Sequence, residues 1–157
     1  MVQSTCKERA ELKMIKRNSI ILLIRNYYIE SEFLTYFDTG WNTQFFPSFT
    51  NEGQSEEELK EAIAKRFESP LCDVSLNYIG EFSETKPCRE HNDEIREYRY
   101  EIYSVDLALG TMHQLPTFYW NGLKYKWESP KRLKKDSQVM KNNLALVKFV
   151  EQFEKKY

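Results

Sequence analysis

The spacing of apolar residues predicts extended structure in the first third of the chain. The uninterrupted run "IILLI" within residues 18–29 is typical of a strand buried on both faces. Residues 32–38 alternate as a returning strand would, and 43–49 form a third short extended segment that Pro47 interrupts. Ahead of these strands, the mixture of apolar and charged residues over 4–16 predicts an N-terminal helix.

The next element is a helix with a clear beginning. Ser55 and Glu58 form a capping box, in which each side chain satisfies a free backbone N–H group of the other residue. Apolar residues then recur every four positions and predict one buried face: Leu59, Ile63 and Phe67. Pro70 cannot continue a helix and marks its end.

The second half of the chain reads as further strands and two closing helices. Strands are predicted over 73–82 and 94–107, and the second alternates tyrosine and isoleucine with charges, as in a sheet with one wet face. The remaining elements are a hairpin around Asn121-Gly122, a short helix capped by Ser129 and a final helix over 138–155. This order predicts an α+β domain with a mixed, mostly antiparallel sheet sandwiched between helices.

Composition narrows the functional classes. With 157 residues, 41% hydrophobic and 30% charged, the chain can bury a core and is not disordered. A net charge of −1 gives no electrostatic case for nucleic-acid binding, so no nucleic-acid partner is expected. Three cysteines without a Cys-x-x-Cys pair, and two histidines, argue against structural zinc and for a reducing cytoplasm. We expect no metal ion and no cofactor.

Two features leave alternatives open. Aromatic residues make up 15% of the chain, which fits either a β-rich core or a pocket that stacks on a base. The basic segment 1–17 could be a free N-terminal helix or a juxtamembrane piece beside an anchor outside this chain, followed by a domain over 18–157. The longest apolar run is too short to span a bilayer.

The element order, together with the stretch "FFPSFTNEGQSEEELKEAIAKRF" and the closing "YKWESPKRLKKD", resembles the Nudix fold. The signature of that family is G-x5-E-x7-R-E-U-x-E-E-x-G-U, where U is aliphatic, and it binds divalent cations and a diphosphate. Aligning "NEGQS" with the family's common "E-x-G-E-S" sets the register. The signature positions are then held by Ser48, Gln54, Ala62, Ile63, Ala64, Arg66, Phe67, Ser69 and Pro70.

These departures remove the carboxylates that the family uses. Ile63 and Phe67 offer no lone pairs to magnesium, and Arg66 places a fixed positive charge near the expected cation. We therefore predict that the chain is a catalytically degenerate domain and not an enzyme. The alternative is an active hydrolase of nucleoside-diphosphate derivatives with a relocated metal site at Glu57 and Glu61, which are spaced i, i+4 on the helix.

An arginine in place of carboxylates could hold an anion directly. We predict a binding site for a nucleotide-like anionic small molecule, with cations for phosphate and a polar-aromatic group for a base. The candidate residues are Arg25, Trp41, Asn42, Gln44, Phe46, Lys65 and Arg66.

A narrower resemblance concerns the apolar first strand, "FFP" and the closing tryptophan strand with "KNN". These are similar to the SMODS-associated NUDIX family, found beside nucleotide-second-messenger synthases in bacterial antiviral gene neighbourhoods. The resemblance implies a cytoplasmic nucleotide sensor in antiphage defence, which could be tethered at the inner membrane or act with a membrane-anchored or defence-system partner protein. A protein–protein interaction module without a small ligand is the other alternative.

Overall fold

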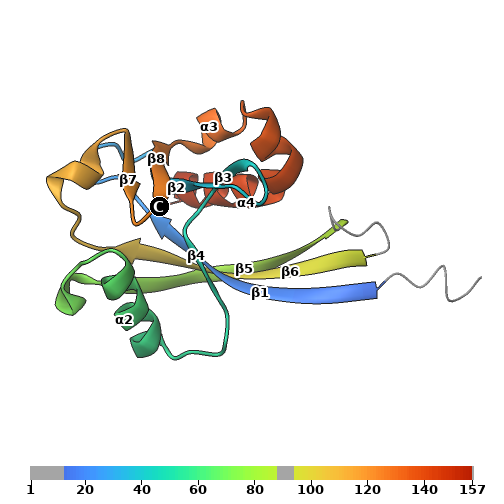
Figure 1. Ribbon diagram of the computed structural model, residues 1–157, viewed down its shortest axis with the longest axis horizontal. Coiled ribbons are helices and arrows are strands. Elements are labelled where there is room, and N and C mark those ends of the chain that lie inside the picture. The colour runs from blue at the N-terminus through green and yellow to red at the C-terminus, as the bar shows by residue number, and fades with distance from the viewer. Residues whose placement is uncertain (1–12, 88–93, 157) are drawn as a thin grey trace, which may run out of the picture.

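The computed structural model describes residues 13–87 and 94–156, which form two four-stranded sheets and three α-helices (Figure 1). The long sheet has the order β4-β1-β6-β5 and the short sheet has the order β3-β2-β8-β7. The long sheet consists of β1 (Lys13–Ile24), β4 (Ser48–Thr50), β5 (Ser75–Pro87) and β6 (Glu94–Asp106). The short sheet consists of β2 (Phe33–Asp38), β3 (Thr43–Phe45), β7 (Thr117–Trp120) and β8 (Leu123–Glu128). The helices are α2 (Glu56–Arg66), α3 (Pro130–Leu133) and α4 (Ser137–Lys156).

Strand β1 lies at the centre of the molecule. It runs parallel to β6, whereas the other strand pairs are antiparallel, so the predicted mixed, mostly antiparallel arrangement is confirmed. All residues from Ile20 to Ile24 are buried, as the unbroken apolar run predicted. Because side chains alternate along a strand, the even positions enter one core and the odd positions enter another.

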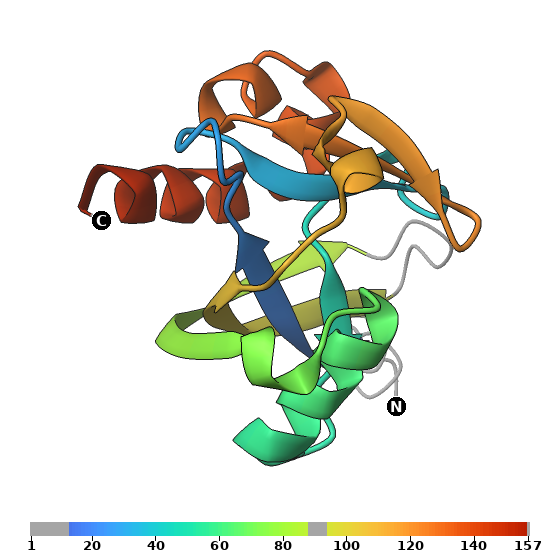
Figure 2. The same cartoon turned by 90° about the vertical axis from the view of Figure 1, so that its left-hand side faces the viewer.

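The helices cover opposite faces of the long sheet, as Figure 2 shows with α2 below it and α4 above it. Helix α2 packs with Ile20, Leu22 and the short sheet, whereas α4 packs with Ile21 and Leu23. The expected α/β/α sandwich of the Nudix-like class is therefore present.

Helix α2 forms as its sequence predicts. The Glu58 N–H donates to the Ser55 hydroxyl at 3.2 Å and the Ser55 N–H donates to the Glu58 carboxylate at 3.1 Å, which completes the capping box. Leu59, Ile63 and Phe67 are 1%, 0% and 2% exposed, so the predicted apolar face is fully buried.

The beginning of the chain differs from the prediction. Residues 4–12 lie outside the described part, but Lys13 already belongs to β1, so the last residues of the expected helix are extended instead. Pairing with the whole length of β6, from Lys13 opposite Glu94 to Ile24 opposite Val105, outweighs the local helical spacing. The division into segments 1–17 and 18–157 stays a prediction.

The first strand also ends earlier than residue 29. The Asn26 side-chain oxygen accepts hydrogen bonds from the N–H groups of Tyr28 and Ile29, at 2.9 and 3.2 Å, and turns the chain after Ile24. Within the described residues, no helix is both long enough and apolar enough to cross a bilayer.

Candidate functional site

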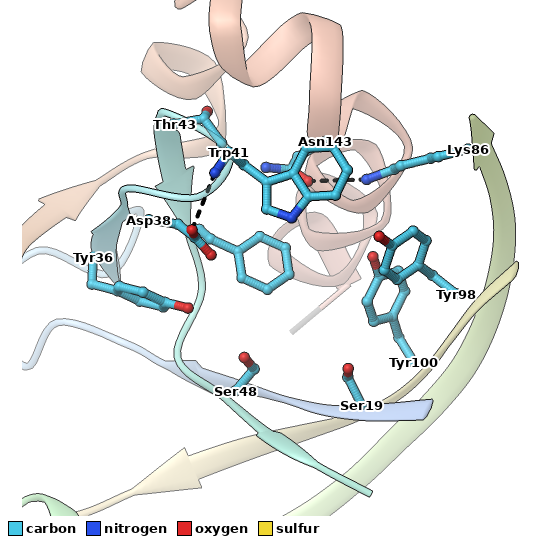
Figure 3. A pocket seen from close by; sticks show the side chains of 11 residues that line it. Ser19, Tyr36, Asp38, Trp41, Thr43, Ser48, Lys86, Tyr98, Tyr100 and Asn143 are labelled. Atoms are coloured by element: carbon cyan, nitrogen blue, oxygen red, sulfur yellow. Dashed lines mark hydrogen bonds between the residues drawn. The ribbon is translucent and has the colours of Figure 1, made fainter. Parts of the chain in front are cut away.

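A cavity of about 180 Å³ lies between the long sheet, the β2–β3 connection and α4 (Figure 3). We call it the Trp41 pocket. Its floor is formed by Ser19, Tyr98 and Tyr100 of the long sheet. Its roof is formed by Asp38, Trp41, Thr43 and Phe45, and its sides by Tyr36, Ser48, Lys86 and Asn143. Aromatic rings therefore line it from both sheets.

Strand register assembles the floor. Ser19 of β1 pairs with Tyr100 of β6, and paired residues point to the same face of a sheet. Tyr98 lies two positions earlier and shares that face; its ring stacks on Tyr100 with an interplanar angle of 11°. Burial raises the pKa of the Tyr100 phenol, and the nearby Glu84 and Tyr98 raise it further, so this hydroxyl remains a neutral hydrogen-bonding group.

The roof is positioned by Asp38 at the end of β2. Its carboxylate accepts hydrogen bonds from the N–H groups of Gly40 at 2.9 Å and Trp41 at 3.2 Å, which folds the connection back on itself. The Trp41 indole then meets Tyr98 edge to face, with 6.3 Å between ring centroids. Thr43 is 2% exposed and its hydroxyl has no hydrogen-bond partner within the described residues.

Lys86 brings a positive charge to the pocket from β5. Its ammonium lies 5.6 Å from the Trp41 ring centroid and 5.2 Å from that of Tyr98, within cation–π distance of both. It also lies 2.8 Å from a Glu84 carboxylate oxygen and donates to the Asn143 side-chain oxygen at 3.3 Å. The charge is held at the boundary between the aromatic walls and solvent.

Asn143 reaches the pocket because α4 is broken there. Its backbone leaves helical geometry, with φ −133° and ψ 19°, and its side chain is buried. The amide nitrogen donates to the Gln44 carbonyl at 3.3 Å while the amide oxygen accepts from Lys86. A kink in an otherwise regular helix thus ties α4 to β3 and β5 at the pocket.

Arg66 of α2 contacts the pocket wall on the side away from the cavity. Its guanidinium donates to the Ser48 carbonyl at 2.9 Å and to the Tyr125 hydroxyl at 3.2 Å, and it lies over the Tyr36 ring. Burial and the Asp38 charge raise the pKa of the Tyr36 phenol, while its hydrogen bond with the Ser48 side chain and the Arg66 charge lower it. Arg66 therefore connects α2 with the wall formed by Tyr36 and Ser48.

The structure brings together only some of the seven candidate residues. Trp41 lines the pocket, Gln44 accepts a hydrogen bond from Asn143 through its backbone, and Arg66 lies behind the wall. Phe46 is 2% exposed and belongs to the core on the α4 side, and Asn42 is exposed in the connection with φ 54°.

The other two candidate cations lie elsewhere. Lys65 is exposed on α2. Arg25 follows β1, where its guanidinium lies 5.2 Å from the Phe33 ring centroid and 5.4 Å from that of Phe153. The structure therefore does not gather Arg25, Lys65 and Arg66 into one cationic site.

Most of the pocket was not anticipated from the sequence. Tyr98 and Tyr100 belong to a strand whose alternation predicts one wet face, and the alternation does place them on the same face. What the sequence lacked was the partner strand, because the parallel pairing of β1 with β6 joins segments about eighty residues apart in register. Lys86 and Asn143 carried no signal beyond their polar side chains.

The residues at the signature positions of α2 do not fit the divalent cation that the Nudix resemblance implies. Ile63 and Phe67 are buried in the core, and Arg66 donates its N–H groups to protein oxygens. In the alternative pair, Glu57 is exposed and lies 3.7 Å from Lys60, and Glu61 is exposed as well. Across residues 13–87 and 94–156, no three His, Cys, Asp or Glu side chains are grouped to hold a metal ion.

Comparison with solved structures identifies the architecture. No protein-family model and no curated protein matches the chain. The C. elegans Ap4A hydrolase matches with a TM-score of 0.53 and 13% identity, over 88% of this chain and 99% of that chain. A NUDIX hydrolase from Nitrosomonas europaea matches with a TM-score of 0.50 and 11% identity, over 90% of each. The chain has the Nudix fold.

These comparisons correct one prediction. The substitutions in the helix predict that the chain is not an enzyme, but the two solved structures named above are hydrolases. The expectation rested on one segment, residues 48–70, whereas the likeness extends over most of the chain. Loss of the usual carboxylates from one helix is therefore not sufficient to assign the chain to the non-enzymes.

Proposed function

We propose that this Nudix-fold domain binds a nucleotide-like anionic small molecule in the Trp41 pocket. The observation that carries the proposal is the combination of aromatic walls and a cation in one cavity: Trp41, Tyr98 and Tyr100 with Lys86. Each base has a π-face that stacks on aromatic side chains, and a lysine contributes a point charge for phosphate.

The polar groups of the pocket suit the edge of a base. The Asn143 amide, the Thr43 hydroxyl and the Asp38 carboxylate offer donors and acceptors beside the rings. A hydrogen bond to a bound ligand would satisfy the buried Thr43 hydroxyl, which is otherwise unpaired within the described residues. We assign Trp41 as a direct contact, and Gln44 and Arg66 as supports of the pocket walls.

A second candidate function is hydrolysis of the bound nucleotide derivative. The observation that favours it is the likeness to the C. elegans Ap4A hydrolase over nearly the whole chain. Glu57 and Glu61 remain the residues proposed for a relocated metal site. The narrower proposal, a sensor in antiphage defence that works with a membrane-anchored or defence-system protein, is supported only by the resemblance of the first strand and the closing segment to the SMODS-associated NUDIX family.

Isothermal titration calorimetry tests the binding proposal. The purified chain is titrated with Ap4A and with the common nucleoside mono-, di- and triphosphates, each with and without magnesium. We expect saturable binding of at least one nucleotide. The Trp41→Ala variant should weaken it about tenfold, because base–aromatic stacking is worth about 1–3 kcal/mol.

A matched control is Tyr119→Ala, which removes an aromatic ring that is 75% exposed on β7, outside the pocket. It should leave the dissociation constant unchanged. Absence of binding across the whole panel, or equal loss in both variants, would refute the proposed site. Chromatography of the same mixtures reports hydrolysis, and turnover that disappears in Glu57→Ala or Glu61→Ala would establish the second candidate.

A further inference from the structure

The face of the long sheet that forms the pocket floor continues past the pocket toward the first residues of β1 and β6, the right-hand end in Figure 1. Strand register shows which side chains share this face. Arg17 pairs with Tyr98, and Ile15 pairs with Arg96. On the other side of β6, Lys86 pairs with Arg96. Paired residues point to the same side of a sheet, so the three cations surround Tyr98 on the pocket face. We call Arg17, Lys86 and Arg96 the cationic platform.

The two faces of these strands carry opposite charge. Among the side chains that the structure describes on these strands, the pocket face carries two carboxylates: Glu84, which pairs with Tyr98 and lies 2.8 Å from Lys86, and Asp106 at the far end of β6. The reverse face carries two cations and three carboxylates: Lys16, Arg99, Glu81, Glu97 and Glu101. The excess of positive charge is therefore specific to the face that the pocket opens from.

The platform also departs from the usual rules of strand pairing. Lys86 and Arg96 lie directly opposite each other on neighbouring strands, a position in which like charges repel, and the Glu84 carboxylate 2.8 Å from Lys86 offsets part of this repulsion. Departures of this kind tend to occur at functional sites, where another gain compensates for them. An anion bound between the two side chains would gain a charge-assisted contact with each of them.

The size of the pocket shows how much of a nucleotide it can hold. Its volume of about 180 Å³ is below the roughly 300–1,000 Å³ that is usual for pockets enclosing a whole small molecule. It therefore accommodates a ring system, and the rest of a nucleotide must lie outside.

The charges at the two ends of the pocket decide in which direction a nucleotide would lie. Figure 3 shows Asp38 beside Tyr36 at one end, and Lys86 above Tyr98 at the other. A phosphate is repelled by the carboxylate and attracted by the ammonium and the platform beyond it. The base end of a ligand thus faces Asp38, and the phosphate end leaves past Tyr98.

We propose that the ligand is a nucleoside carrying two or more phosphates, whose base occupies the Trp41 pocket and whose phosphate chain lies on the cationic platform. This inference rests on the proposed function and assigns phosphate recognition to β1, β5 and β6 in place of α2. Arg17 and Arg96 then act as phosphate-binding residues that no helix motif indicates.

Calorimetry with matched ligands tests this orientation. ATP, GTP, CTP and UTP are each compared with the corresponding monophosphate and nucleoside, and inorganic tripolyphosphate serves as a probe without a base. For the nucleotide that binds, we expect the triphosphate to bind at least about tenfold more tightly than the monophosphate, and more weakly as salt is raised. Arg17→Gln and Arg96→Gln should each reduce triphosphate affinity about fivefold and leave nucleoside affinity unchanged, because a charge-assisted contact to phosphate is lost.

Lys16→Gln is the matched control, since it removes one positive charge from the same strand on the reverse face. It should leave triphosphate affinity within about twofold, and thermal unfolding should show that all variants fold.

Equal affinity for mono- and triphosphates, or equal effects of Arg17→Gln and Lys16→Gln, would overturn the orientation while leaving base binding intact. Failure of every nucleotide would overturn both proposals. Tighter binding of a single-stranded hexanucleotide than of any triphosphate would replace the small molecule by a nucleic-acid strand.

Discussion

Helix α2 and the Trp41 pocket lie near each other but are built in opposite ways. The helix turns Leu59, Ile63 and Phe67 into a closed core, and Arg66 donates to protein oxygens. The pocket leaves aromatic faces and polar side chains around a cavity, at the junction of the two sheets and α4. The first region is closely packed, whereas the second encloses a cavity, where we propose that a ligand binds.

A segment with a familiar pattern can therefore keep its structural role while the proposed binding surface lies in another part of the fold. The capping box and apolar face of α2 are intact, and they hold the helix against the long sheet. The proposed site instead depends on side chains that six strands, the β2–β3 connection and α4 bring together. Changes in the two regions should therefore separate effects on stability from effects on affinity.

The largest effect is expected from Phe67→Ala. The ring is 2% exposed and lies 5.6 Å from the Trp120 ring centroid and 6.3 Å from that of Tyr125. Its removal leaves a cavity and should lower the free energy of unfolding by about 3–5 kcal/mol. Urea denaturation measures this change. At a temperature where the variant is folded, its nucleotide affinity should stay within about twofold of the wild-type value. A loss of affinity larger than the loss of stability would show that the helix and the pocket do not act separately.

Arg66→Met tests the residue that joins the two regions. It removes the hydrogen bonds to the Ser48 carbonyl and the Tyr125 hydroxyl, and should destabilise the fold by about 2 kcal/mol. Because Ser48 and Tyr36 line the pocket, a small loss of affinity should accompany it. Lys65→Met, on the exposed side of the same helix, should change stability by no more than about 0.5 kcal/mol. Equal effects of the two variants would show that Arg66 is an ordinary surface cation.

Ser19→Val should lower nucleotide affinity more than stability, the opposite of Phe67→Ala. Ser19 lies on the pocket floor, half-buried between β4 and β6. The added methyl groups enter the cavity and should weaken nucleotide binding several-fold, while valine suits a strand and should keep stability within about 1 kcal/mol. Calorimetry measures the affinity and urea denaturation measures the stability of the same sample. Unchanged affinity together with a large loss of stability would show that the cavity is not the binding site.

The smallest effect is expected at the start of α2. Ser55→Ala removes the cap and should cost about 1 kcal/mol without altering affinity. The hydrogen bonds with Ser55 lower the pKa of Glu58 from its ordinary value of 4.5. A lowered folded-state pKa means that this contribution is complete above about pH 4.5 and is lost as the pH falls further. Urea denaturation across this range should show a smaller acid dependence for Ser55→Ala than for the wild-type chain; equal slopes would argue against the capping box as its source.

Local chemistry in the sequence determined much of the fold. The Ser55–Glu58 box, the Asn121-Gly122 turn and the unbroken run from Ile20 to Ile24 each depend on a few neighbouring residues, and each is present as predicted. Such signals persist because the interactions that carry them are short in range. They were sufficient to predict the order of the elements from residue 18 onward and the sandwich.

Only the tertiary structure decided where the chemistry lies. The parallel pairing of β1 with β6 turned Lys13–Lys16 from an expected helix into a strand and aligned Ser19 with Tyr100. The break of α4 at Asn143 and the long β5 then brought an amide and Lys86 to the same cavity. Pairings between distant segments depend on the packing of the whole chain, and no local pattern of residues specifies them.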